Sequence, residues 1–205
     1  MAKYELNYEA LDEEEQDKKK KDNSAEDMLD WLEMLITVFF AVVLVFTFIF
    51  RIAIVDGESM VPTLEDKDKL VVSHLFYEPE DGDVVIVNSK GLGKVIVKRV
   101  IATENQTVDV DYSEGKVYVD GQLLDEPYIN EPTITDFGFH DYPVTVPAGH
   151  VFVMGDNRNH STDSRAESVG FVDKSDIMGK AVFRIWPFNK LGALPEDAGE
   201  TAEQG

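Results

Sequence analysis

An uninterrupted apolar stretch near the N-terminus constrains this chain more than any other feature. The residues from Met34 to Phe50, which read MLITVFFAVVLVFTFIF, carry no charge. With the apolar residues on either side, the stretch approaches the roughly 20 residues that span a bilayer. A cleavable secretory signal has a shorter apolar run, of about 7 to 15 residues, followed by a small-residue cleavage site. The pattern therefore predicts one uncleaved transmembrane helix over residues 29–55.

The charged flanks of this stretch predict its orientation. Lys18–Lys21 precede it, whereas Arg51 stands alone just after it. Because cytoplasmic flanks carry the excess of Lys and Arg, we expect a single-pass protein of the cell membrane with its N-terminus in the cytoplasm. Residues 1–28 are dense in charge and residues 189–205 are acidic and small. Both segments are predicted to be disordered tails.

The region between the predicted helix and the C-terminal tail reads as β structure. Residues 56–188 alternate turn signals with the short apolar runs LVV, DVVIV, VIVKRVI, TVDVDY, KVYV and HVFVMG. This spacing is typical of an all-β domain. Turn residues at 113–115 and 120–121 predict two hairpins, in a segment of about 106–145 that we interpret as a smaller inserted subdomain. The fold class is therefore mainly β, with a β-rich extracytoplasmic domain after one transmembrane helix.

Composition excludes several classes of function. The formal net charge of −21 argues against nucleic acid as a partner, because a phosphate-binding surface needs a basic face. The chain has no cysteine, which removes disulfides, thiolate metal sites and cysteine nucleophiles. Its four histidines do not have the spacing of metal ligands. We expect no metal and no cofactor, and the oligomeric state stays open.

A serine follows the predicted membrane segment directly. Ser59 lies in the sequence Gly57–Leu64, which reads GESMVPTL. The chain from Arg51 to Ser59 spans at most about 28 Å, so this serine stays close to the bilayer surface. A serine beside Gly and Pro is explained equally well by turn formation. Ser59 is thus a candidate nucleophile that its own motif does not prove.

A lysine interrupts the apolar strand predicted over 94–102. At a period of two residues Lys98 shares one face with Ile96 and Val100, and Arg99 lies on the other face, so either orientation buries a cation. A lysine held in apolar surroundings has a lowered pKa, and its neutral amine can act as a base. The alternative is an edge strand whose lysine reaches solvent.

A dense polar run, GDNRNHSTDSR, occupies Gly155–Arg165 after an apolar strand. Such a run suits a loop held by its own hydrogen bonds, and Asp163 and Arg165 are expected to pair through a bidentate contact that orients it. A solvated loop is the alternative. A serine, a desolvated lysine and a polar loop are the parts of a Ser-Lys hydrolase. The spacing alone leaves the pairing of Ser59 with Lys98 open.

These three segments resemble the type I signal peptidases, the bacterial leader peptidases of the S26 type. The family's S-M-x-P-T-L box is present as Ser59–Leu64, its lysine box resembles Val97–Ala102, and its G-D-N-R-x-x-S-x-D-S-R box is Gly155–Arg165. The resemblance implies a signal-peptidase-like β domain in which Ser59 is the nucleophile and Lys98 the general base.

The resemblance also implies roles for supporting residues. The Ser161 hydroxyl would orient the Lys98 amine, and Asp163 and Arg165 would support the structure of the site. Met60 would lie beside the groove that binds substrate. Some members carry a serine two residues before the nucleophile that helps to stabilise the oxyanion, but this chain has Gly57 there. Stabilisation would then come from the backbone N–H groups of Gly57 and Ser59.

The function implied is that of a membrane-bound serine endopeptidase. Its partners would be the lipid bilayer and secretory preproteins with small residues at positions −1 and −3, from which it removes N-terminal signal peptides. A self-cleaving repressor-type Ser-Lys protease is a rival, but such a protein would be soluble and carry a DNA-reading domain. The other alternative is a catalytically dead or single-substrate relative that acts as a membrane-tethered binding module.

Overall fold

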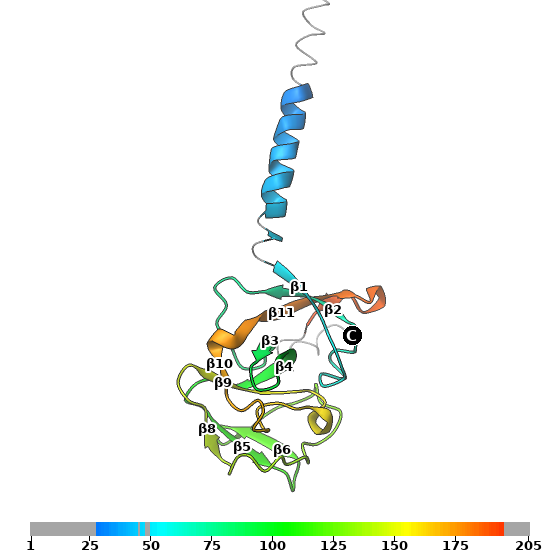
Figure 1. Ribbon diagram of the computed structural model, residues 1–205. Helices are drawn as coiled ribbons and strands as arrows, with labels where there is room; N and C mark the ends of the chain where they lie inside the picture. The colour runs from blue at the N-terminus through cyan, green and yellow to red at the C-terminus, as the bar shows by residue number, and fades with distance from the viewer. Residues whose placement is uncertain (1–27, 45, 48–49, 195–205) are drawn as a thin grey trace, which may run out of the picture. The chain divides into compact units, whose positions relative to one another are not determined.

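The computed structural model describes residues 28–44, 46–47 and 50–194. The chain divides into two units, Met1–Phe48 and Ile49–Gly205. The described residues of the first unit are helical, over 28–44 and 46–47 (Figure 1). Within the described ranges, no helix has both the length and the apolar character needed to cross a membrane. Of the tail predicted over residues 1–28, residues 1–27 lie outside the described part of the chain.

Two boundaries predicted from the sequence are wrong. The end of the predicted transmembrane segment forms strand β1 (Phe50–Ile54), which pairs antiparallel with β2 (Lys69–Ser73). A short apolar run suits helix and strand equally, and here a neighbouring strand supplies the backbone partners. The predicted tail 189–205 begins as ordered structure, since β12 (Gly192–Ala193) pairs with β11 and Leu194 is buried. Residues 195–205 lie outside the described part.

The second unit is mainly β, as the alternating pattern predicts. Its larger sheet has the order β1-β2-β11-β3-β4-β9-β10, with β12 added beside β11, and its smaller sheet has the order β7-β6-β5-β8. The remaining strands of the larger sheet are β3 (Val84–Ser89), β4 (Lys94–Ala102), β9 (His150–Met154), β10 (Val172–Asp173) and β11 (Ile177–Trp186). The smaller sheet consists of β5 (Thr107–Asp111), β6 (Lys116–Val119), β7 (Gln122–Leu123) and β8 (Val144–Thr145). Short 3₁₀ helices are η1 (Arg158–His160), η2 (Lys174–Asp176) and η3 (Phe188–Lys190).

Both predicted hairpins are present in the smaller sheet. Strand β5 pairs with β6, and β6 pairs with β7. The second turn contains Asp120 and Gly121 at φ 51° and 77°, the positive values that a tight two-residue hairpin turn requires. The segment that we interpreted as an inserted subdomain therefore supplies the second sheet.

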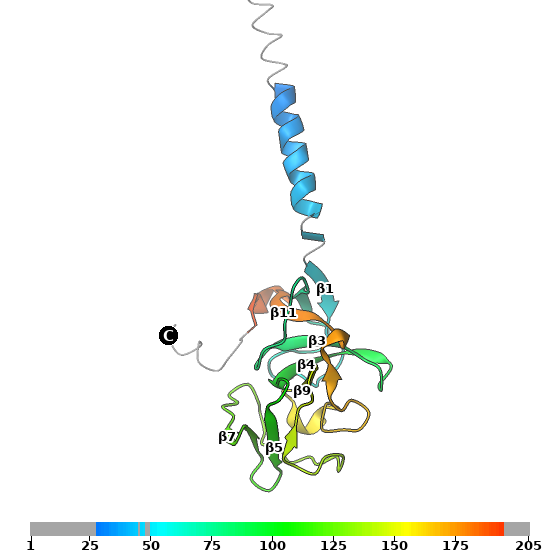
Figure 2. The ribbon, with the colours of Figure 1, turned by 90° about the vertical axis from the view of Figure 1, so that its left-hand side faces the viewer.

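The apolar core joins the two sheets and holds the loops between them. One cluster packs β4 and β9 against the smaller sheet, which lies next to them in Figures 1 and 2. Another cluster forms under β2, β3 and β11 and includes Met60 and Leu64, which flank the Ser59 motif. Burying side chains of this size stabilises the fold by about 1.5–3 kcal/mol each. The turn that carries Ser59 is thus anchored to the core through the side chains of Met60 and Leu64.

Strand β4 has one edge that is only half covered. On one side its residues 94–99 pair with β3, from Ser89↔Lys94 to Val84↔Arg99. On its other side β9 pairs only with Arg99, Val100 and Ala102. In the described part of the chain, residues 94–98 of β4 therefore lack a strand partner on that side. On this side their backbone faces no strand and can receive an added one, although the Val97 carbonyl already accepts a hydrogen bond from the Lys98 Nζ.

Candidate active site

Ser59 occupies a rigid turn between β1 and β2. Gly57, at φ +95°, starts the turn, and the Val61 N–H donates to the Glu58 carbonyl at 3.2 Å. Met60 follows with only 1% of its surface exposed, in the core. A residue at a positive φ is unfavourable unless it is glycine, which explains Gly57 at this place. The serine hydroxyl is therefore held by a backbone that has little freedom to move.

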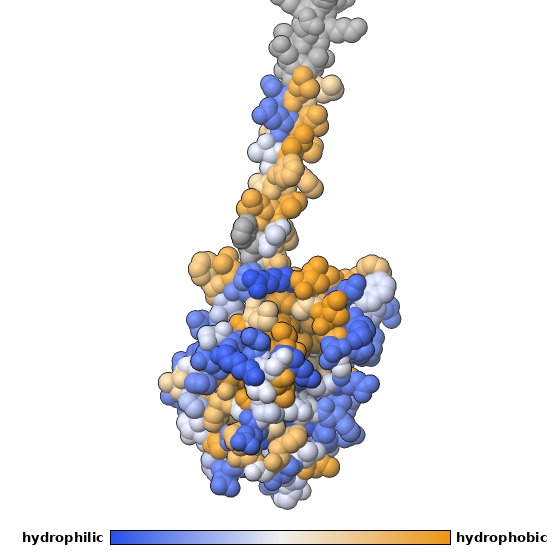
Figure 3. All heavy atoms as spheres, viewed as in Figure 1, coloured by the Kyte–Doolittle hydropathy of each residue, from blue (hydrophilic) through white to orange (hydrophobic). Residues whose placement is uncertain are grey.

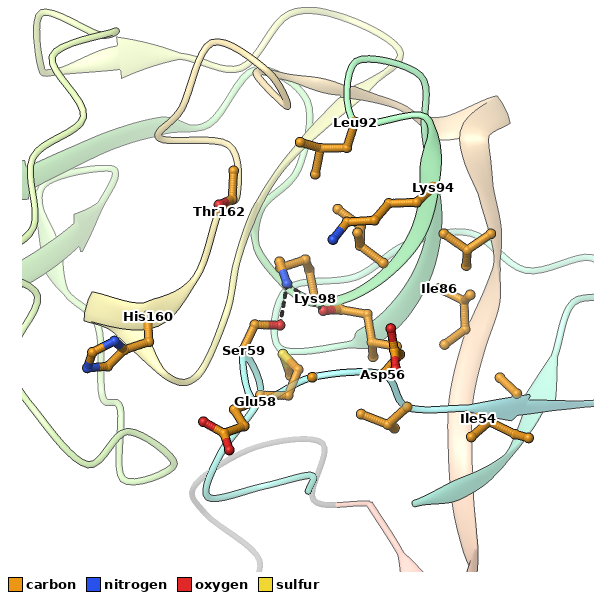
Figure 4. A pocket seen from close by; sticks show the side chains of 17 residues that line it. Ile54, Asp56, Glu58, Ser59, Ile86, Leu92, Lys94, Lys98, His160 and Thr162 are labelled. Atoms are coloured by element: carbon orange, nitrogen blue, oxygen red, sulfur yellow. Dashed lines mark hydrogen bonds between the residues drawn. The ribbon is translucent and has the colours of Figure 1, made fainter. Parts of the chain in front are cut away.

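The structure brings Lys98 to this serine. The Lys98 Nζ donates to the Ser59 Oγ at 2.6 Å and to the Val97 carbonyl at 2.9 Å, as Figure 4 shows for the serine. Lys98 and Arg99 are 2% and 1% exposed, which confirms that both faces of this strand bury a cation. The alternative of a lysine that reaches solvent is wrong.

The surroundings of Lys98 favour its neutral form. Burial lowers the pKa of Lys98 from 10.5 to about 8, because the charged ammonium loses its hydration. The carboxylates of Asp163 and Asp156 act in the opposite direction, and the charges of Lys94 and Arg165 add to the lowering. A neutral amine at 2.6 Å from a hydroxyl is within range to accept its proton.

The polar run after β9 is a buried network centred on Asp163. This carboxylate accepts hydrogen bonds from the Gly155 N–H at 3.0 Å and the Ser161 hydroxyl at 2.7 Å. Arg165 binds it with two nitrogens, Nε at 2.8 Å and Nη2 at 2.9 Å. Asp163, Ser161 and Arg165 are all buried. The predicted bidentate contact is confirmed, and the solvated-loop alternative is wrong.

Ser161 lies beside the pair without bonding to the lysine. Its hydroxyl donates to Asp163, and among the described residues no hydrogen bond joins it to the Lys98 Nζ. Gly155 lies between it and the backbone of Ser59, since a Cβ on Gly155 would collide with the Ser161 Oγ and the Ser59 carbonyl oxygen. Ser161 and Ser59 thus pack against Gly155 so closely that only a residue without a side chain fits between them.

Fewer backbone N–H groups are free to stabilise an oxyanion than the sequence predicts. The Gly57 N–H already donates to the Asp66 Oδ1 at 2.8 Å, so it is not free to bind a substrate oxygen. No hydrogen bond within the described part of the protein involves the Ser59 N–H. Of the two backbone groups predicted, the structure leaves that of Ser59 available.

Sequence reasoning missed Asn157, which binds the backbone of the turn that carries Ser59. Its backbone N–H donates to the Ser59 carbonyl at 3.0 Å and its Nδ2 donates to the Glu58 carbonyl at 3.0 Å. The polar run pointed to a supporting loop, but no local pattern indicates which backbone an asparagine will bind. Asn157 therefore links the third motif directly to the first.

A second unpredicted link runs through Asp156. This buried carboxylate accepts from the Arg99 Nε at 2.9 Å and Nη2 at 2.8 Å, and also from the Thr63 hydroxyl. Thr63 belongs to the serine motif and Arg99 to the lysine motif. One aspartate thus joins all three motifs, and charge-assisted bidentate contacts of this kind fix geometry strongly.

An open groove leads to the Ser59–Lys98 pair. It has a volume of about 270 Å³ and lies between the segment that follows β1 and the uncovered half of β4. Met60 contributes to its lining, and Leu92 and Lys94 border it on the β4 side in Figure 4. Glu58 and His160 border it beyond Ser59. The described site can therefore present a hydroxyl and a desolvated amine to an extended chain.

Comparison with known proteins supplies the identity that this geometry suggests. Residues 28–186 match the family model described as signal peptidase, peptidase S26. A relative in Synechocystis sp. named "Probable signal peptidase I-2" is 36% identical over 192 residues, covering 88% of this chain and 84% of the relative. Signal peptidase I of Bacillus licheniformis is 33% identical and covers 84% of this chain and 96% of its own length. A crystal structure of a signal peptidase I from Enterococcus faecalis superposes with a TM-score of 0.44 at 31% identity, over 51% of this chain and 97% of that one.

The match extends over far more of the chain than the three motifs. It includes strands of both sheets, among them β4 with Lys98, and the loops that carry Ser59 and Asp163. The protein is a peptidase, and so a hydrolase. The chain belongs to the signal peptidase family, peptidase S26.

Proposed function

We propose that this protein is a membrane-bound serine endopeptidase that removes signal peptides from secretory preproteins through a Ser59–Lys98 dyad. One observation carries the proposal: a buried lysine whose pKa falls to about 8 lies 2.6 Å from a serine hydroxyl at the end of an open groove. A nucleophile and a base within hydrogen-bond reach are what nucleophilic catalysis by serine needs. The dyad uses no metal and no cofactor.

The substrate binds as an added strand. The uncovered backbone of β4 from residue 94 to residue 98 offers hydrogen bonds to an extended chain, and the segment after β1 forms the opposite wall. Alternate side chains of such a chain point into the groove, whose lining includes the buried Met60, Ile86 and Ile96. Because these side chains leave little depth, residues at −1 and −3 have to be small.

The chemical steps follow from the dyad. Neutral Lys98 takes the proton of Ser59, the Oγ attacks the carbonyl carbon of residue −1, and the Ser59 N–H donates to the oxyanion that forms. The ammonium of Lys98 then returns the proton to the leaving amine as the peptide bond breaks. The same amine, again neutral, activates a water molecule that hydrolyses the acyl-enzyme.

The supporting residues hold this geometry. Ser161 and Arg165 fix the carboxylate of Asp163. Of the two carboxylates that raise the pKa of Lys98, Asp163 has the larger effect. Ser161 thus acts on the lysine through Asp163 and through its packing on Gly155. Asn157 fixes the turn of Ser59.

Membrane attachment is the second part of the proposal. It is supported by the uncharged sequence from Met34 to Phe50 and by the short chain distance from there to Ser59. Exposed apolar side chains around β1 and the end of β11 add support, among them Ile52 at 70% and Phe188 at 71% exposure (Figure 3). We place the N-terminus in the cytoplasm and the β unit outside. A signal peptide in the same bilayer would then be held at a high effective concentration.

The test is cleavage of a preprotein with Ala-x-Ala before its mature start, in detergent, by the wild type and by Ser59→Ala and Lys98→Ala. We expect processing by the wild type and a loss of about 10³-fold or more in each variant. Ser113→Ala and Lys116→Ala, in an exposed hairpin turn, are the matched controls and should retain activity. Unchanged processing by Ser59→Ala would reject the dyad. An inactive wild type would favour the dead or single-substrate relative.

A further inference from the structure

A second lysine lies in the groove on the same face of β4 as the proposed base. Lys94 begins the strand, and residues 94, 96 and 98 point to one side because side chains alternate along a strand. Lys94 lines the groove and is exposed. In Figure 4 its amine extends along the groove toward Ser59 and Lys98 rather than away from them.

The positive charge of Lys94 is not neutralised by a neighbour. Across the described residues no ion pair involves Lys94, whereas Asp56 on the opposite wall pairs with Lys67 at 2.7 Å. Glu58, the other acidic side chain of the lining, lies on the far side of Ser59 from Lys94 in Figure 4. After burial and the charge of Asp163, Lys94 is the next influence on the pKa of Lys98, so its field reaches the reacting groups.

The strand geometry indicates which substrate residue meets this charge. The acyl side of the substrate carries the small residues −1 and −3, and it lies in the part of the groove between β1 and β4. An added strand matches β4 one residue for one residue, at about 3.3 Å per residue. With residue −1 beside Lys98, residue −5 lies beside Lys94. The side chain at −5 shares the face of −1 and −3, and that at −4 points away.

We propose that Lys94 is a specificity-determining residue that reads the charge of the side chain at position −5, favouring an acidic residue and disfavouring a basic one. This inference rests on the proposed function and adds to it a preference in the signal peptide upstream of the small residues. An ion pair at an exposed site changes a rate constant by about two- to fivefold.

The test compares kcat/KM for Ala-x-Ala peptides with Glu, Gln or Lys at −5, and for the same three residues at −4 as the positional control. We expect the wild type to prefer Glu to Gln, and Gln to Lys, by about two- to fivefold at each step at −5. Preferences at −4 should be smaller. The enzyme variants are Lys94→Gln, which should cleave all three peptides equally, and Lys94→Glu, which should invert the order.

Ratios between peptides for one enzyme cancel any change that Lys94 variants cause in Lys98 itself. The preference should also shrink at 1 M salt, where the Debye length is about 3 Å. Cleavage by the wild type without a charge preference at −5 would overturn the inference and leave the proposed function intact. So would a preference that survives in Lys94→Gln, or one that is larger at −4. Failure of the wild type to cleave any peptide would overturn both.

Discussion

At the scale of a single residue, the burial of Lys98 has two opposing effects, one on its pKa and one on the stability of the fold. The burial that lowers its pKa to about 8 also costs stability, because the folded chain holds this proton more weakly than the unfolded chain, where the pKa is near its ordinary 10.5. Between these values the unfolded chain binds more protons, so the free energy of unfolding rises with pH through this window. Below about pH 8 the full cost is present. The burial that would prepare Lys98 for its proposed role as a base therefore lowers the stability of the fold.

The same pKa predicts how the rate of cleavage depends on pH. Only neutral Lys98 can accept the proton of Ser59, so kcat/KM should rise about tenfold per pH unit up to pH 7 and level off above about pH 9. Initial rates at low substrate concentration between pH 6 and 9.5 measure this profile. A rate that is already constant from pH 6 would show that Lys98 is not the base.

Gly155 is the residue on which the elements of the site converge. It follows β9 directly, its N–H donates to Asp163, and its missing side chain leaves room for Ser161 and for the backbone of Ser59. Strand β9, the supporting loop and the serine turn meet at this one position. Any atom added there has to displace Ser59 or the hydrogen-bond network that supports it.

Replacing Gly155 by alanine is therefore expected to reduce activity strongly while most of the fold remains. Overpacking of this kind costs about 1–3 kcal/mol of stability, and a displacement of about 1 Å at the nucleophile costs on the order of 10²-fold in rate. The measurements are kcat/KM and the urea midpoint. Gly192→Ala in β12, where nothing lies within 4 Å of the added carbon, is the control and should change neither. Full activity of Gly155→Ala would contradict the close packing.

At the scale of elements, the sequence predicts local structure well and long-range pairing poorly. Between residues 69 and 154 the strands and hairpins are predicted, except β8, because each of their apolar runs is bounded by its own turn residues. The strand over Phe50–Ile54 is missed, because its apolar residues continue a helical pattern and only the distant β2 makes them a strand. Partners for β4 and β11 cannot be found from periodicity, which carries no information on register.

The site divides in the same way. Alternation predicts that Lys98 and Arg99 are both buried, and proximity in sequence predicts that Arg165 binds Asp163. The contacts of Asn157 and Asp156 with the serine motif join residues that are far apart in the chain, so no local pattern predicts them. The occupied N–H of Gly57 depends on the position of Asp66 across a turn, which only the folded backbone determines.

At the scale of the whole molecule, the unit from Ile49 to Gly205 contains every core cluster among the described residues and the complete candidate site. A chain that starts at residue 49 is therefore expected to cleave a soluble Ala-x-Ala peptide within about twofold of the full chain, since each step uses only groups of this unit. On a preprotein embedded in vesicles the same fragment should be slower by about 10- to 100-fold, because it has lost the proposed confinement to the bilayer.

The comparison of full chain and fragment on both substrates separates the two parts of the proposed function. Detergent is the control, since it removes the bilayer and should make the two proteins equal on the preprotein. Equal rates on vesicles would contradict the proposed attachment through the N-terminal segment. Loss of peptide cleavage by the fragment would show that the second unit needs the first.

The order of strands in the larger sheet has a consequence for the synthesis of the protein. Strand β11 lies between β2 and β3, although it is made after all the other strands of that sheet except β12. Pairings between segments this far apart form slowly and only once the chain is nearly complete. Until β11 is made the two halves of the sheet are not joined, although the segment with Ser59 is synthesised long before. A chain that ends before β11 therefore lacks the strand that joins β2 to β3, and we do not expect it to hold Ser59 beside Lys98.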